Sequence, residues 1–446
     1  MRTRPRRPEM QAGTEATRSP GRTPDLATPA GTVGRVTDTI EETGLSPADE
    51  QAFADRVRAF LEANCRRTGD RQGTIGDEDP EGLGATRDFQ AALADAGLAG
   101  LTYPTDFGGA GLTKRHQEVF NREVEGWHLP NTPLSISHGM CLPMLNQFGT
   151  SEQKARFMAD NIRGTTIWCQ MFSEPGAGSD VASLAMKATR DGDEWILEGQ
   201  KVWTSGAHYC DYGIVVARTD PEQPKHQGVT MFIVDLRQPG VEVRPLRQIS
   251  GGSGFNEVFF TEARTPADWQ LGDRGQGWNL AVAMLMFERV SIGAGGGSAL
   301  NADRTPGLIE AARARGQAGD PVVRQGLADL WIRERIRGYI GQRIRAAVAE
   351  GRVPGPEGSI AKLNGAILAR RVRDVSLAIA GSSAQAWDAG DDAGDRWAVG
   401  CLSTAGISIA GGTDEVQRNI IGERVLGLPK EPDPWKGAAW EDVPRS

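Results

Sequence analysis

Apolar residues recur at helical spacing through the first part of the chain, from Ser46 to Ile162. Its clearest helix start is Ser46-Pro47, where a capping serine, a proline and two acidic residues stand close together. Turns rich in glycine and proline separate the helical segments. The spacing predicts helices at residues 46–64, 85–96, 112–124, 140–148 and 152–162.

The period changes to that of β-strands near Thr166. Short segments rich in β-branched and aromatic residues follow one another, bounded by Gly, Pro and Asp. They predict a compact all-β unit of about a hundred residues, which ends near Thr265. The expected strands are residues 186–190, 194–198, 211–218, 228–235, 241–245 and 255–261.

Helical spacing returns at Trp278 and continues to a last helix, which begins at Thr413 and ends at Gly427. Between them, helices are expected at residues 278–293, 321–351 and 356–381. The order α, β, α indicates an α+β fold with an N-terminal helical domain, a central β-barrel-like domain and a C-terminal helical bundle. The expected limits are a disordered tail at residues 1–40, domains at 41–166, 167–268 and 269–430, and a tail at 431–446.

Composition narrows the class of protein. The chain has 446 residues and a net charge of −8, which argues against nucleic acid or an anionic membrane surface as a partner. No apolar run approaches the ~20 residues that a membrane-spanning helix needs. The five cysteines form no CxxC pair and the five histidines no HExxH pattern, so neither a metal site nor a disulfide framework is expected. These features favour a cytoplasmic protein.

A loop of glycine, proline and small polar residues lies at Glu174–Asp180. Glycine tolerates positive φ, and the N–H groups of such a turn can form a concave site for an anion or a carbonyl. The loop lacks the Gly-Lys-Ser/Thr ending of a nucleoside triphosphate-binding loop, and it is not the Gly-x-Gly-x-x-Gly fingerprint of dinucleotide folds. A ligand site of another kind is therefore expected, and its nature depends on the motifs around it.

Several segments form a set with a defined order and spacing. They are Phe172–Asp180, Lys201–Gly206 and Gly411–Asn419, with Gly358–Lys362 and Ile421–Pro429 in support. Together they resemble the acyl-CoA dehydrogenase family, and the last two its bacterial branch. The resemblance extends from Leu45 to Glu431, and that family's order of helical, β and helical domains agrees with the order that periodicity predicts.

The resemblance implies FAD as cofactor, an acyl-CoA thioester as substrate and an electron-transferring flavoprotein as oxidant. It also implies a dimer or tetramer, either homomeric or heteromeric. Ser179 would lie near the CoA arm as well as the flavin, Trp203 would pack on the isoalloxazine ring, and Thr204 and Ser205 would hydrogen-bond to it. By position, the residues expected along the flavin are Gln170, Met171, Phe172, Ser173, Ser179, Trp203, Thr204, Ser205, Thr413 and Glu415.

The implied reaction takes a proton from the α-carbon of the thioester and passes the β-hydride to the flavin, so a positioned carboxylate is needed as base. In many relatives that base is a glutamate just before the Gly-Thr of the C-terminal motif, where this chain has Gly411. We expect Glu288 to be the base instead, because burial in the apolar segment Leu280–Ile292 would raise the pKa of its carboxyl. Gly411 would leave room for this carboxylate, and its backbone N–H would serve the thioester oxygen.

Other charged residues carry weaker functional signals. Arg289 is a candidate substrate ligand, with a structural role as the alternative. Glu174 is expected to be a structural acid of the loop, and Asp180 to bond backbone N–H groups in its turn. Arg418 is expected to be a salt-bridge partner in the last helix.

Two other functions stay open. One is a related flavin oxidase or monooxygenase that uses O₂ on a CoA-bound or carrier-bound substrate. The other is a non-catalytic partner subunit that completes the FAD or CoA site of another chain. The sequence lacks the Arg-x-x-Phe-Gly element with which relatives contact the FAD of a neighbouring subunit, and this absence favours the second alternative.

Overall fold

The computed structural model describes residues 45–67, 80–293, 305–349, 356–384 and 392–444, and all structural statements refer to these residues. The tail expected at residues 1–40 lies outside them.

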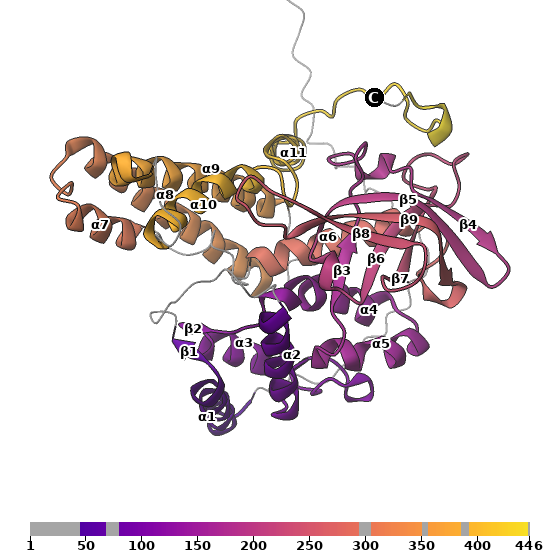
Figure 1. Ribbon diagram of the computed structural model, residues 1–446, viewed down its shortest axis with the longest axis horizontal. Coiled ribbons are helices and arrows are strands. Elements are labelled where there is room, and N and C mark those ends of the chain that lie inside the picture. Colours follow the sequence, from indigo (N-terminus) through magenta and orange to yellow (C-terminus); the bar gives the residue numbers. More distant parts are fainter. Residues whose placement is uncertain (1–44, 68–79, 294–304, 350–355, 385–391, 445–446) are drawn as a thin grey trace, which may run out of the picture. The chain divides into compact units, whose positions relative to one another are not determined.

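The first part of the chain is helical, as predicted (Figure 1). Its first helix begins at the expected cap, because Ser46 Oγ accepts the N–H of Asp49 at 3.1 Å and Pro47 follows the cap directly. One face of this helix is buried in the largest hydrophobic core. The helices are α1 (Pro47–Asn64), α2 (Pro80–Asp95), α3 (Lys114–Glu123), α4 (Leu142–Phe148) and α5 (Ser151–Arg163), and a small ribbon pairs β1 (Arg66–Arg67) with β2 (Trp127–His128).

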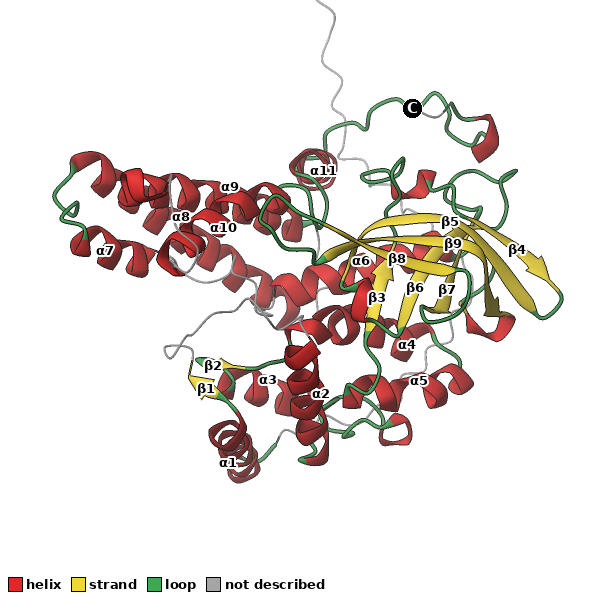
Figure 2. Cartoon of the chain, viewed as in Figure 1, coloured by secondary structure: helices red, strands yellow, loops and turns green. Residues whose placement is uncertain are grey.

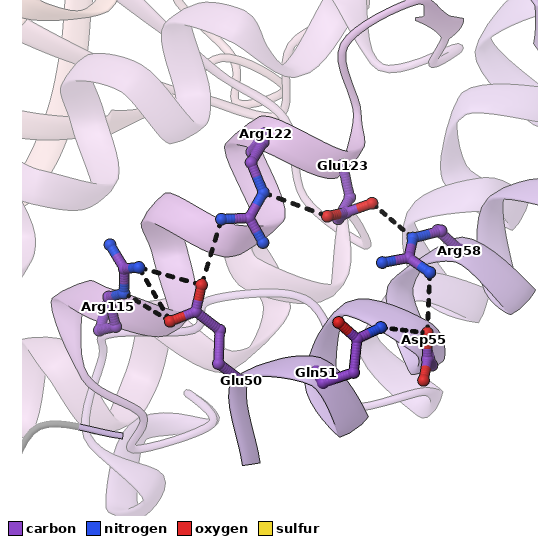
Figure 3. Close-up of polar contacts among 7 residues, drawn as sticks. All are labelled: Glu50, Gln51, Asp55, Arg58, Arg115, Arg122 and Glu123. Atoms are coloured by element: carbon purple, nitrogen blue, oxygen red, sulfur yellow. Dashed lines mark hydrogen bonds and ion pairs between the residues drawn. The ribbon is translucent and has the colours of Figure 1, made fainter. Parts of the chain in front are cut away.

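Charged side chains join α1 to α3 (Figure 3). Glu50 accepts from Arg115 at 2.8 Å and from Arg122 at 3.2 Å, while Arg58 donates to Glu123 at 2.7 Å. Hydrogen bonds from Arg115 and from Arg58 are the main reason that the pKa values of Glu50 and Glu123 are lowered. Exposed ion pairs contribute little to stability, so the buried face of α1 contributes more to its packing than this network does.

An eight-stranded sheet occupies the middle of the chain (Figure 2). Two long antiparallel strands, β5 and β9, run side by side through it. The strand order is β10-β7-β6-β4-β5-β9-β8, and β3 pairs with β6 in parallel, so the pairings among the described strands form an open path. The strands are β3 (Trp168–Met171), β4 (Lys187–Asp191), β5 (Glu194–Ser205), β6 (Tyr212–Arg218), β7 (Val229–Asp235), β8 (Val241–Leu246), β9 (Phe255–Pro266) and β10 (Gln270–Leu271).

The remaining helices follow the sheet. Helix α9 packs against α8 on one side and α10 on another, and α11 packs against it as well (Figure 1). Helices α7 and α10 were not anticipated by the hydrophobic periodicity. The helices are α6 (Gly277–Gly293), α7 (Thr305–Ala314), α8 (Pro321–Ala349), α9 (Glu357–Ala380), α10 (Asp392–Ile407) and α11 (Asp414–Ile420).

The order of helical, β and helical parts is therefore as predicted. The exact domain limits stay a prediction, because residues 44–446 form one compact unit. Helix α6 connects the parts, since it packs on α4 and on β7 of the sheet and also contacts α9. No helix within the described ranges is long and apolar enough to cross a membrane. The described residues likewise hold no cluster of three or more His, Cys, Asp or Glu side chains that could bind a metal ion.

Candidate active site

The end of β3 and the two residues after it bury some side chains and leave others half-buried. Met171 and Phe172 are buried in hydrophobic cores, so they can meet a ligand mainly through their backbones. Gln170 and Ser173 are half-buried and have polar groups available to a ligand.

A buried ion pair anchors the glycine loop to β5. Lys201 Nζ lies 2.8 Å from Glu174 Oε1 and donates to Phe172 O at 3.0 Å. The Glu174 carboxylate also accepts the N–H groups of Ala185 at 2.6 Å and Met186 at 3.0 Å. Burial lowers the pKa of Lys201, while Glu174 acts in the opposite direction. Glu174 is thus the structural acid that the sequence analysis predicted, and its lysine partner was missed although it begins the second motif.

Trp203 stands out on β5. Its φ is +61°, and its side chain is 60% exposed. The pairing of β5 with β9 shifts register between Lys201 and Thr204, and this bulge carries Trp203 out of the ladder. A bulky residue at positive φ is strained, and such positions persist where the surroundings impose them, often at functional sites. The exposed indole offers an open face to a planar ligand.

The next two residues bring hydroxyl groups to the same place. Thr204 is 2% exposed, and its Oγ1 is buried without a hydrogen-bond partner among the described residues. Ser205 is half-buried. A buried hydroxyl that lacks a partner is costly. Because protein atoms cover the Thr204 hydroxyl, that of Ser205 is the one of this pair that is open to a ligand. The backbone is held in place because Asn256 Nδ2 donates to Thr204 O at 3.0 Å.

Glu288 and Gly411 are brought together from distant parts of the sequence. Glu288 lies on α6 and is half-buried. Gly411 has a φ of +65°, and a Cβ built on it would lie 3.4 Å from Glu288 Oε1. The carboxylate therefore occupies the space beside the missing side chain. The side chain of Arg289, the neighbouring candidate, lies outside the described residues.

The start of α11 uses its residues in different ways. Thr413 is the N-cap, and its Oγ1 accepts the N–H of Val416 at 3.2 Å, which leaves its O–H available to donate. Glu415 is exposed and pairs with Arg418 at 3.2 Å, so Arg418 is a salt-bridge partner as expected. Asp414 is the buried acid, although the sequence analysis gave it no role.

Asp414 ties α11 to α9. Its carboxylate lies 2.8 Å from Arg370 and 3.6 Å from Lys362, both on α9, and its backbone N–H donates to Ser408 O at 3.0 Å. These contacts fix the position of the Gly411 turn, which directly precedes α11. An acid in the first turn of a helix is common for electrostatic reasons, and this is why its burial could not be read from the sequence.

The turn after the glycine loop corrects one expectation. Asp180 was expected to accept backbone N–H groups, but its carboxylate accepts from the Ser183 hydroxyl at 2.5 Å and from Lys225 Nζ at 2.6 Å. Burial raises the pKa of Asp180, but the Lys225 and Ser183 contacts outweigh it and the pKa is lowered. Ser179 beside it is exposed.

Comparison with known proteins identifies the family. Residues 47–165, 169–263 and 275–426 match the N-terminal, middle and C-terminal domains of acyl-CoA dehydrogenases. The chain is 38% identical to the acyl-CoA dehydrogenase IpdE1 of Mycobacterium tuberculosis over 388 residues, which cover 86% of this chain and 99% of that protein. The chain belongs to the acyl-CoA dehydrogenase family. As a member it is an oxidoreductase, an FAD-dependent acyl-CoA dehydrogenase.

Solved structures agree with this acyl-CoA dehydrogenase fold. The Tcur3481-Tcur3483 steroid ACAD matches with a TM-score of 0.71 and 26% identity over 87% of this chain and 99% of that one. The ChsE4-ChsE5 complex from Mycobacterium tuberculosis matches with a TM-score of 0.68 and 26% identity over 87% of this chain and all of that one. The helical, β and helical fold class is thereby confirmed.

The residues of this acyl-CoA dehydrogenase fit a flavin on structural grounds. The half-buried Ser205 hydroxyl and the exposed ring of Trp203 meet two needs of an isoalloxazine ring, which are hydrogen bonding at its edge and packing on its face. Ser173 O accepts the N–H of Val202 at 2.9 Å, so the glycine-loop segment and the Trp203 segment form one surface.

Proposed function

We propose that the chain catalyses the α,β-dehydrogenation of an acyl-CoA thioester, with Glu288 as the base that takes the α-proton. The observation that supports this role is the 3.4 Å between Glu288 Oε1 and the Cβ position of Gly411. Relatives of the common type carry their glutamate at the position of Gly411. Here a carboxylate from α6 reaches that place, and the glycine leaves room for it.

Glu288 would hold the abstracted proton, and the other contacts would orient the thioester. A half-buried carboxylate on an apolar helix is less solvated than a surface one, which favours a base strong enough for an α-carbon acid. The Gly411 N–H would donate to the thioester oxygen, where negative charge develops. Arg289 is a further candidate substrate ligand.

FAD, when bound, supplies the hydride acceptor. Trp203 would pack on its ring and Ser205 would bond its polar edge. The bond that the resemblance implies for Thr204 would require its buried hydroxyl to come within reach of the ring. Gln170 and Ser173 would offer side chains along it, while Met171 and Phe172 would offer their backbones. Ser179 would lie near the flavin and the CoA arm. Thr413 can donate its hydroxyl proton, and the exposed Glu415 stands at the N-terminus of the same helix.

Membership of the family also suggests an electron acceptor, a substrate class and an oligomeric state. We propose that an electron-transferring flavoprotein reoxidises the flavin and that the chain works as a dimer or tetramer. The steroid ACAD among the similar structures supports a bulky, ring-derived CoA thioester as a substrate class. The ChsE4-ChsE5 complex supports a heteromeric assembly.

The test is anaerobic reduction of the purified flavoprotein by a panel of acyl-CoA thioesters. The panel contains short, branched, long linear and steroid-derived acyl groups. At least one should bleach the flavin absorbance, and Glu288→Gln should abolish bleaching with no loss of FAD. Glu118→Gln, which changes an exposed acid paired with Arg115 on α3, serves as the matched control and should bleach normally. Failure of every thioester to bleach an FAD-loaded protein would overturn the proposal.

Two further measurements separate the alternatives. Peroxide formation in air without another electron acceptor would indicate an oxidase. A non-catalytic partner subunit is favoured by the heteromeric relatives, and full turnover by this chain expressed alone would exclude that role as its sole function.

A further inference from the structure

Residues 439–443, which we call the strap, return to the sheet after the last helices of the chain. Trp440 N–H donates to Gln223 O at 2.9 Å, and Glu441 N–H donates to Pro221 O at 3.2 Å. Ala439 also forms an isolated antiparallel bridge with Pro224. The strap is therefore bonded through its backbone to the loop between β6 and β7.

The Trp440 side chain reaches further, into the turn that follows Ser179. Its ring is 9% exposed, and its Nε1–H donates to Ser183 O at 3.2 Å. Residues Val181–Ser183 form a short 3₁₀ turn directly after Ser179 and Asp180. Because its N–H is hydrogen-bonded and its ring is buried, Trp440 makes a specific contact with the turn.

Arg218, at the end of β6, connects the strap and the turn. Its guanidinium donates to Ala182 O at 2.7 Å and to Leu184 O at 3.1 Å, and it lies 4.3 Å from the centre of the Trp440 ring. Arg218 is 3% exposed. The indole thus covers an arginine whose fixed donors hold two carbonyl groups of the turn.

The turn held in this way directly follows the glycine loop. Gly176, Gly178 and Ser179 are exposed, and a Cβ on either glycine would meet no atom within 4 Å. The loop at these residues is therefore open to a ligand. The other anchor of this turn is the bond from Lys225 to Asp180, and Lys225 belongs to the same β6–β7 loop that the strap bonds.

We propose that Trp440 and Arg218 are positioning residues, which hold the turn at residues 179–184 in the conformation that receives the CoA arm of the substrate. This inference rests on the proposed function, because Ser179 is assigned to the CoA arm there. The strap acts on the substrate only through the turn. It has no part in the flavin surface at Trp203 and Thr204 or in the proton transfer at Glu288.

The test uses the full FAD-loaded protein and compares Trp440→Ala with Trp435→Ala. Trp435 precedes the strap and is 46% exposed, so it is the matched control. Loss of the ring should raise hydrogen–deuterium exchange in residues 179–186. It should also weaken CoA binding in calorimetry and raise KM for the acyl-CoA, each by about fivefold. FAD content and kcat should stay at the wild-type level, and Trp435→Ala should change none of these.

A second variant separates positioning from general damage to the fold. Trp440→Phe keeps a ring over Arg218 but removes the N–H donor, so its exchange and its CoA affinity should fall between wild type and Trp440→Ala. Unchanged exchange at residues 179–186 would overturn the inference, as would unchanged CoA affinity or a parallel loss of FAD. The exchange and CoA measurements need no turnover, so they decide the inference even when no thioester in the panel reduces the flavin.

Discussion

Trp203 has a backbone conformation that costs stability. A non-glycine residue at positive φ costs roughly 1–2 kcal/mol, and the large exposure of its ring means that little packing offsets this cost. The sequence placed Trp203 beside the flavin only through the resemblance. Its strain and exposure could not be foreseen, because they depend on a register shift between two strands that are distant in sequence.

Trp203→Gly should separate stability from cofactor binding. Glycine accepts the φ of +61° without strain but gains entropy in the unfolded state, so the free energy of unfolding of the apoprotein should change by no more than about 1 kcal/mol. FAD affinity should fall about tenfold with the loss of the packing surface. Urea unfolding and flavin fluorescence titration measure the two effects. Unchanged FAD affinity would show that Trp203 does not contact the ring.

The contact between Gly411 and Glu288 was predicted from the sequence, but the interactions that hold Gly411 in place were not. The sequence has glycine at position 411 instead of a glutamate and has Glu288 on an apolar helix. Together these two positions predicted that Glu288 reaches the space beside Gly411. The structure brings them together because Asp414 fixes the turn through Arg370 and Lys362, and this buried contact was not foreseen. The chemical role of Glu288 stays a prediction until the bleaching experiment is done.

At the scale of elements, the glycine loop and β5 behave as one unit because of Lys201 and Glu174. Lys201→Met should leave the Glu174 carboxylate buried without its cation and lower the free energy of unfolding by about 3–5 kcal/mol. The double variant Lys201→Met/Glu174→Gln removes the charge as well and should be less destabilised than the single one. Urea denaturation measures both. Equal losses in the two variants would mean that the uncompensated charge is not the cause.

His138 makes the short helical turn before α4 sensitive to acid. Its Nε2 lies 2.8 Å from Asn161 O, and burial lowers its pKa below the ordinary value of 6.5. Below pH 6.5 the unfolded chain therefore takes up a proton that the folded one resists, so stability falls as pH drops toward the folded-state pKa. This loss can reach about 1.4 kcal/mol per pH unit for one such group. His138→Gln keeps a donor for Asn161 and should flatten the dependence of unfolding free energy on pH between 7 and 5; an equal slope in both proteins would contradict it.

Hydrophobic periodicity predicted most elements but missed α7 and α10. Both helices are short or contain residues that favour turns, such as the glycine and proline early in α7 and the glycines of α10. Packing against α8 and α9 stabilises them, and this contribution has no local signature in the sequence. Turn residues bound six of the eight strands of the sheet and made them easier to predict, whereas β3 and β10 were missed.

At the scale of the whole molecule, α8 carries an apolar face that the described chain leaves in solvent. Its exposed residues include Trp331, Ile332, Ile336 and Tyr339, each about half exposed or more. Apolar surface of this extent is typical of association, and we expect a second chain to cover it. Trp331→Glu/Tyr339→Glu should shift the sedimentation coefficient toward the monomer with FAD content unchanged. An unaltered oligomer would show that the interface lies elsewhere.

The contact between Trp440 and Ser183 spans 257 residues of sequence. During synthesis, the turn at residues 181–183 leaves the ribosome long before its partner exists. At ~5–20 residues per second, the delay is roughly 10–50 s. Until then Arg218 can bond its carbonyl acceptors but has no tryptophan ring over it. The turn at residues 181–183 also lacks its hydrogen bond from Trp440. We therefore expect the loop to reach the conformation needed for the proposed CoA contact only after translation has passed Trp440. Completion of this site would then be a late step in the synthesis of the protein.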